Sequence, residues 1–152
     1  MKKWTWILGL TAAVVIGVML WTPNVRIQTD EELGMAMLRA GGEAEPRVPL
    51  ADLTPGLEWD TVHTFGGYTG IDEIEDEIGA RISRPGLGFL LGSGFVQEGG
   101  RLLVFTMNGS PVRASLIPPV LTRISGANST WHSDVEVDGG AEVSFHHPAE
   151  DS

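Results

Sequence analysis

The sequence predicts an α+β domain with a mostly antiparallel sheet, arranged as a strand, a helix and then a β-meander, behind an N-terminal transmembrane helix. Three observations lead to this fold class. Residues 4–21 carry no charged side chain, and residues 71–78 place isoleucines at helical spacing. Beyond Pro85, short apolar runs alternate with glycine-containing turns, as in antiparallel strands.

The composition limits the classes of protein to which the chain can belong. It has 152 residues, no cysteine, and 10 Lys+Arg against 20 Asp+Glu, for a formal net charge of −10 at pH 7. This length fits a single domain. The missing cysteines exclude disulfides, thiol nucleophiles and Cys-based metal sites. The negative charge argues against nucleic acid as a partner, because it repels phosphate.

The N-terminal run predicts a membrane anchor. At about 1.5 Å per residue, residues 4–21 extend roughly 27 Å, enough for the bilayer core, and tryptophans bracket the run as in interfacial aromatic belts. A cleaved signal peptide is the alternative, but no small-x-small cleavage site follows the run. By the positive-inside rule, Lys2 and Lys3 place residues 1–3 in the cytoplasm and residues 22–152 outside.

A short helix and a Pro-rich linker are predicted between the anchor and the folded domain, over residues 22–56. Thr29 and Glu32 have the spacing of a capping box, with Thr29 as the cap of a helix that ends at Gly41. Three prolines without an apolar period follow, which indicates an extended linker. We therefore expect the folded core to begin near Leu57.

The domain is predicted to span residues 57–147, with a disordered tail over residues 148–152. Residues 57–65 form a predicted strand whose apolar side chains do not share one parity, which indicates either a bulge or burial on both faces. Thr69 is the predicted cap of the following helix, which ends at Gly79.

The C-terminal half is predicted to be all β. Asn108-Gly109 lies between the apolar runs 102–107 and 112–117, and Asn-Gly in that position is the strongest short hairpin signal. A second hairpin is expected from residues 134–137 and 141–145, where apolar and polar residues alternate.

A motif runs from Trp59 to Gly79 and has the form W-D-x-V-x-x-F-G-x-Y-T-x-x-x-E-I-x-x-x-I-G. Together with the strand and hairpin that follow it, over residues 57–117, it resembles a family of small, uncharacterised bacterial membrane-anchored or exported proteins. Those proteins often have a proline where this chain has Gly67. The resemblance implies a bacterial origin and no particular activity. Five motif residues are expected to be structural: Trp59, Asp60, Phe65, Tyr68 and Thr69.

No catalytic residue and no cofactor site is predicted, and the candidate chemistry rests on the histidines. Successive residues of a strand point to opposite faces, so a pair such as His146-His147 cannot hold one ion without a bend. The candidate metal ligands are His63, His132, His146 and His147.

Two functional hypotheses remain open. In the first, the domain is a non-catalytic module of the bacterial cell envelope, anchored in the cytoplasmic membrane through residues 4–21, that binds another envelope protein. In the second, it is a small extracytoplasmic metal-assisted or hydrolytic enzyme. That enzyme would use His63, Asp60 and His132, with His146 or His147 as further ligands.

Overall fold

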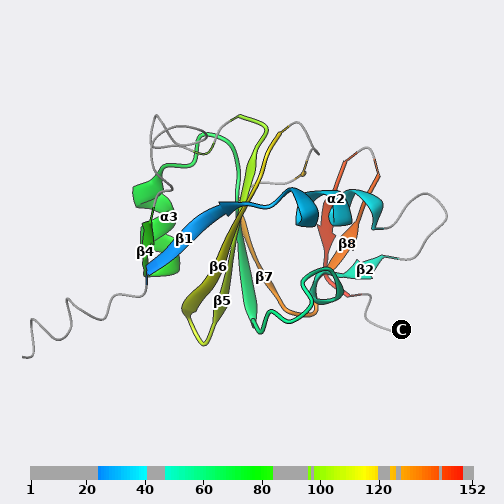
Figure 1. Ribbon diagram of the computed structural model, residues 1–152, viewed down its shortest axis with the longest axis horizontal. Coiled ribbons are helices and arrows are strands. Elements are labelled where there is room, and N and C mark those ends of the chain that lie inside the picture. Colours follow the sequence, from blue (N-terminus) through cyan, green and yellow to red (C-terminus); the bar gives the residue numbers. More distant parts are fainter. Residues whose placement is uncertain are drawn as a thin grey trace, which may run out of the picture.

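The computed structural model describes residues 24–40, 47–83, 96, 98–119, 124–125, 128–140 and 142–148. This part of the chain is mostly strands, with the α-helices α2 (Glu31–Arg39) and α3 (Ile71–Ile78) and the 3-10 helix η1 (Leu50–Leu53) (Figure 1). The strands are β1 (Asn24–Thr29), β2 (Val48–Pro49), β3 (Thr61–Phe65), β4 (Arg81–Ser83), β5 (Arg101–Met107), β6 (Ser110–Ile117), β7 (Ser129–His132), β8 (Glu136–Asp138) and β9 (Ser144–His146).

The predicted anchor over residues 4–21 lies outside the described residues and stays a prediction. Within the described ranges, no helix is both long enough and apolar enough to cross a membrane.

The strands form two sheets, one of six strands in the order β4-β1-β6-β5-β3-β7 and one of three strands in the order β2-β8-β9. β1 runs parallel to β4 and to β6, whereas the other strand pairs are antiparallel. The predicted α+β class is confirmed. The second sheet and the parallel pairing of β1 were not predicted.

The folded region begins earlier than the predicted boundary at Leu57. β1 lies inside the six-stranded sheet, where Val25 and Ile27 alternate with polar residues and are buried. Leu33 and Met37 of α2 are buried as well, and so is Leu50 of η1. The segment predicted as a helix and linker therefore supplies part of the core through these five buried side chains.

The two helices start one residue later than predicted. Thr29 is paired with Leu116 as the last residue of β1, and Asp30 caps α2 by accepting a hydrogen bond from Leu33 N at 3.1 Å. Gly70 is the N-cap residue of α3, because the Thr69 hydroxyl donates to Gly66 O at 2.9 Å instead.

Both predicted hairpins are present. Asn108 and Gly109 have φ values of 52° and 74° and connect β5 to β6, as expected for an Asn-Gly turn. β8 and β9 form the second hairpin. The apolar side chains of residues 57–65 do not share one parity because β3 is buried on both faces. Val62 and Phe65 accordingly belong to different core clusters.

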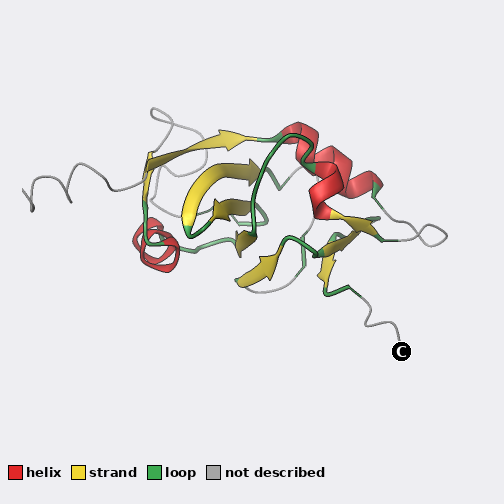
Figure 2. Cartoon of the chain, turned by 90° about the horizontal axis from the view of Figure 1, so that it is seen from below, coloured by secondary structure: helices red, strands yellow, loops and turns green. Residues whose placement is uncertain are grey.

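Two apolar cores lie on opposite faces of the six-stranded sheet. β5 contributes Leu102 and Val104 to the core under α3, and it contributes Leu103 and Phe105 to the core under α2 and the small sheet. In Figure 2 the two helices lie apart, α3 at the left and α2 at the right. β5 is buried on both faces over residues 102–106.

Asp30 connects β1 and α2 to the middle of the sheet. Its carboxylate accepts hydrogen bonds from Ser115 Oγ at 2.7 Å and from Leu33 N, and it pairs with Arg113. Its backbone N–H donates to Leu116 O at 3.0 Å. Burial raises the pKa of Asp30, but these hydrogen bonds and the charge of Arg113 outweigh burial, so the pKa lies below its ordinary value of 3.8.

We expect this carboxylate to make folding stability sensitive to acid. Because the folded-state pKa is lowered, the stabilisation is present above the ordinary value and is lost as the pH falls through the folded pKa. Asp30→Asn should therefore destabilise the protein most at neutral pH and progressively less as the pH falls below 4, measured by chemical unfolding across that range. Asp52→Asn, at an exposed position of η1, is the control and should give no such trend.

Trp59 belongs to the core under α2 and not to the core under α3. It precedes β3, is 8% exposed, and stands edge-on to Phe105 with ring centroids 5.2 Å apart. Its indole N–H donates to Thr54 Oγ1 at 3.1 Å. Trp59 is thus a packed core residue whose indole N–H is hydrogen-bonded.

Trp59→Ala should destabilise the protein by about 3–5 kcal/mol, since it empties a packed site and leaves Thr54 without its donor. Trp59→Phe keeps much of the ring and should cost clearly less. Tyr68→Ala, at an exposed ring, should cost less still. Thermal unfolding measures all three, and a Trp59→Ala melting temperature within a few degrees of the parent would contradict the packing described above.

Candidate functional site

The motif residues divide between the core and one surface. Trp59, Phe65 and Thr69 are buried, and Asp60 accepts a hydrogen bond from Asn108 N at 2.6 Å, which holds the β5–β6 turn. Tyr68 differs from these, because 66% of it is exposed. A structural role, which we expected for all five motif residues, therefore does not explain why the Tyr68 ring is exposed.

Residues 66–69, which we call the Tyr68 loop, hold that ring in place through the backbone. Tyr68 has φ 69°, a left-handed conformation that non-glycine residues rarely adopt. Tyr68 N donates to Val96 O at 2.8 Å, and Val96 N donates to Thr69 O at 3.1 Å. The phenol donates to Glu98 Oε2 at 2.6 Å, which raises the pKa of Tyr68. The ring is therefore fixed at its backbone and at its hydroxyl.

Asn128 fixes the same loop from the other side. Its Oδ1 accepts hydrogen bonds from Gly66 N at 2.9 Å and from the Thr69 hydroxyl at 3.3 Å. Its Nδ2 lies 3.5 Å from Glu73 Oε1 on α3. Sequence reasoning did not assign Asn128 a role at this loop, because it lies about 60 residues from its partners there.

Two adjoining hollows share the side chains of Asn128 and Glu73. The first, the Tyr68 hollow, has a volume of about 530 Å³ and lies over the loop. The second, the His63 cavity, has a volume of about 220 Å³ and lies between α3 and the strands β3 and β7. The His63 cavity is lined by His63, Phe65, Glu73, Glu77, Asn128, Ser129 and Thr130.

Arg101 forms part of the wall of the Tyr68 hollow. Its guanidinium donates twice to Ile124 O, at 2.9 and 2.7 Å, and burial lowers its pKa against the opposing charge of Glu142. A Cβ at Gly66 would clash with this guanidinium. Glycine at position 66 therefore lets the loop pass directly over Arg101, and a larger residue there would require the guanidinium to move.

The structure does not bring the candidate metal ligands together. His63 faces Glu77 and Thr130, His132 lies opposite Thr61, His146 lies opposite Glu136 in the small sheet, and the His147 ring packs on Trp131 with centroids 4.9 Å apart. Across the described ranges, no three His, Asp or Glu side chains form a group that could hold a metal ion. The candidate ligands that the second hypothesis would use therefore do not form a metal site in this part of the chain.

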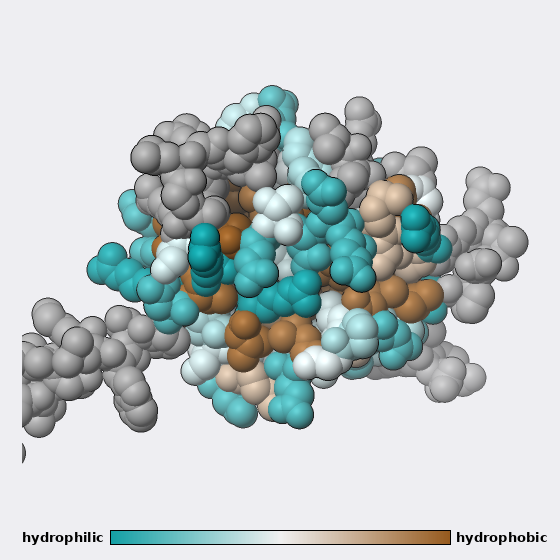
Figure 3. Space-filling view, in the orientation of Figure 1, coloured by the Kyte–Doolittle hydropathy of each residue, from teal (hydrophilic) through white to brown (hydrophobic). Residues whose placement is uncertain are grey.

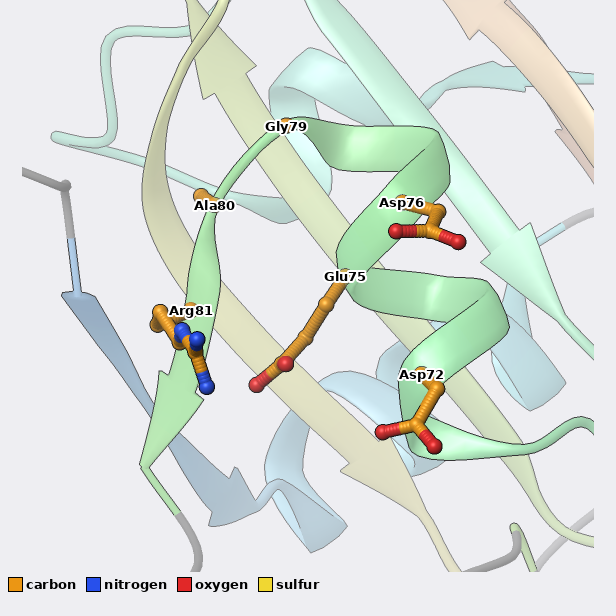
Figure 4. Close-up of a pocket in the computed structure, with 6 residues that line it drawn as sticks. All are labelled: Asp72, Glu75, Asp76, Gly79, Ala80 and Arg81. Atoms are coloured by element: carbon orange, nitrogen blue, oxygen red, sulfur yellow. The ribbon is translucent and has the colours of Figure 1, made fainter.

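A third hollow, of about 450 Å³, lies on the other side of α3, beside β4 (Figure 4). Figure 4 shows Asp72 and Asp76 on the helix and Glu75 extending towards the β4 segment. Glu75 Oε1 accepts a hydrogen bond from Ile82 N at 2.8 Å, so this carboxylate connects the helix to the strand. The face seen in Figure 3 is mostly hydrophilic with small apolar patches between.

We expect Asn128→Ala to loosen the Tyr68 loop. The change leaves Gly66 N–H without its acceptor, which typically costs about 1–3 kcal/mol for a buried donor. Amide hydrogen exchange at Gly66, Tyr68 and Thr69 should accelerate, while exchange in β5 stays unchanged. Asn128→Asp retains an acceptor oxygen and should restore much of the protection at Gly66; equal loss in both variants would show that the amide oxygen does not hold the loop.

Comparisons of this chain with protein-family models, with curated proteins and with solved structures found no match. What the site does has to be inferred from its own residues.

Proposed function

We propose that this chain is a membrane-anchored, extracytoplasmic interaction module of the bacterial cell envelope, which binds a protein partner through the Tyr68 loop and the hollows beside it. The observation that carries the proposal is the Tyr68 ring. An aromatic residue that is 66% exposed adds little to the core, yet its loop is bonded to Val96, Glu98 and Asn128.

The backbone of Tyr68 strengthens this inference. Holding a non-glycine residue in the left-handed region costs of order 1–3 kcal/mol, and such residues concentrate at functional sites. Rigid, exposed aromatic rings are also the side chains most enriched at interaction hot spots. A ring presented in this way loses little conformational entropy when a partner covers it.

The proposed location follows from the sequence. Residues 4–21 are long and apolar enough to span a bilayer, and the lysines precede them. An acidic domain on the outer side would meet other envelope proteins, which is consistent with the bacterial family that the motif resembles.

Site-specific photocrosslinking in intact bacterial cells tests both parts of the proposal. Benzoylphenylalanine replaces Tyr68 in one strain and Val112 in a control strain, because Val112 is 43% exposed and lines neither hollow. We expect a reproducible protein adduct from position 68 only. We also expect the full-length chain in the carbonate-resistant membrane fraction.

Two outcomes would contradict the proposal. Recovery of only random neighbours from position 68 would remove the partner. A secreted species whose N-terminus lies between residues 22 and 45 would show that residues 4–21 are a cleaved signal peptide.

A further inference from the structure

The His63 cavity has a shape and a wall chemistry that the Tyr68 ring does not explain. Its volume of about 220 Å³ is below the roughly 300–1,000 Å³ of typical small-molecule pockets. It is closed on one side by α3 and on the other by β3 and β7. A cavity of this size between a helix and a sheet accommodates a single side chain of a partner.

The walls of the cavity combine an aromatic floor with two carboxylates. The rings of His63 and Phe65 lie parallel within 9°, with centroids 6.3 Å apart. Glu73 and Glu77 stand one turn apart on the α3 wall, and both are exposed. The Thr130 hydroxyl lies 3.2 Å from His63 Nδ1, on the wall formed by β7.

The charges of the cavity favour a cation. Burial lowers the pKa of His63 below its ordinary value of 6.5, against the opposing charge of Glu77, so the ring is neutral at pH 7. The wall then carries the two negative charges of Glu73 and Glu77 and no positive charge. Arg and Lys side chains suit such a site, because they combine an apolar stem with a charged head that carboxylates bind.

The neighbouring strand indicates how a peptide would reach this cavity. β7 stands at one end of the six-stranded sheet, and no strand of the described ranges pairs with its outer side. Ser133 N donates to Asp60 O across the β3–β7 ladder, so by alternation the backbone N–H and C=O of Thr130 and the N–H of His132 point outward. The His132 carbonyl accepts a hydrogen bond from Val135 N at 3.0 Å instead. Thr130 lies opposite His63 in that ladder, on the sheet face that carries the cavity.

We propose that the partner adds an extended basic segment along β7 and inserts one Arg or Lys side chain between Glu73, Glu77 and His63. A strand paired with β7 places alternate side chains on the face of the sheet that carries the cavity. This inference rests on the proposed binding function and names the chemistry of the partner.

The test measures binding of a capped ten-residue peptide of alternating Arg and Thr to the full-length chain in detergent. The matched peptide replaces each Arg by citrulline, which keeps the shape and removes the charge. A third peptide carries proline at its central positions and cannot pair along β7. We expect the Arg peptide alone to bind well.

The variants separate the cavity from the general acidity of α3. The double variant Glu73→Gln/Glu77→Gln should weaken binding of the Arg peptide by about tenfold or more, as expected for lost charge-assisted hydrogen bonds. Asp72→Asn/Asp76→Asn removes the same charge from the same turns of α3 but lines the hollow of Figure 4 instead, and should change binding less than twofold.

The results that overturn the inference are distinct from those that overturn the proposed function. Equal weakening by both double variants, or equal binding of the citrulline peptide, would show that the cavity takes no cation. Equal binding of the proline peptide would exclude pairing along β7. If crosslinks from position 68 persist in either case, the interaction module stands and only this account of its partner fails.

Discussion

The buried carboxylate of Asp30 is the interaction on which the placement of α2 against the six-stranded sheet depends. β1 crosses from the α3 end of the sheet to the α2 end, and Asp30 stands at the point where the strand becomes a helix (Figure 1). Its bonds to Ser115, Arg113 and Leu33 N satisfy the charge that burial would otherwise penalise. Any shift that broke one of these bonds would leave an unpaired buried charge. The bonds therefore hold the start of α2 in a fixed position relative to β6.

This arrangement puts the two helices on opposite faces of the sheet and leaves the candidate site on the α3 face. α3 contributes Ile71, Ile74 and Ile78 to the core, so its opposite residues are free to line a surface. Glu73 and Glu77 occupy that position beside the end of the sheet formed by β3 and β7. The site therefore follows from an ordinary amphipathic helix that covers only part of a sheet.

The elements with strong local signals could be predicted from the sequence. Asn108-Gly109 requires left-handed backbone that matches a tight hairpin, and the apolar stripe of α3 has a clear period. β1 was missed because Val25 and Ile27 give only two apolar positions in six residues, next to a stronger apolar run. β7 was missed because an edge strand needs few apolar side chains. Asn128 and Thr130 reach the site through long-range pairing, which no local pattern encodes.

The motif supplies both core residues and residues of the candidate site from one segment. This explains why its core and surface residues could not be told apart from the sequence. Phe65 packs in the core under α3 while its ring lies parallel to His63, so one side chain both stabilises the sheet and forms the floor of the cavity. Gly66 and Thr69 are needed for the loop path, because Arg101 and Asn128 occupy the space on either side. Tyr68 and Glu73 are the motif residues whose side chains are exposed. Changes at these two positions alter the surface without emptying the core, so at these motif positions an effect on the proposed binding can be measured apart from an effect on stability.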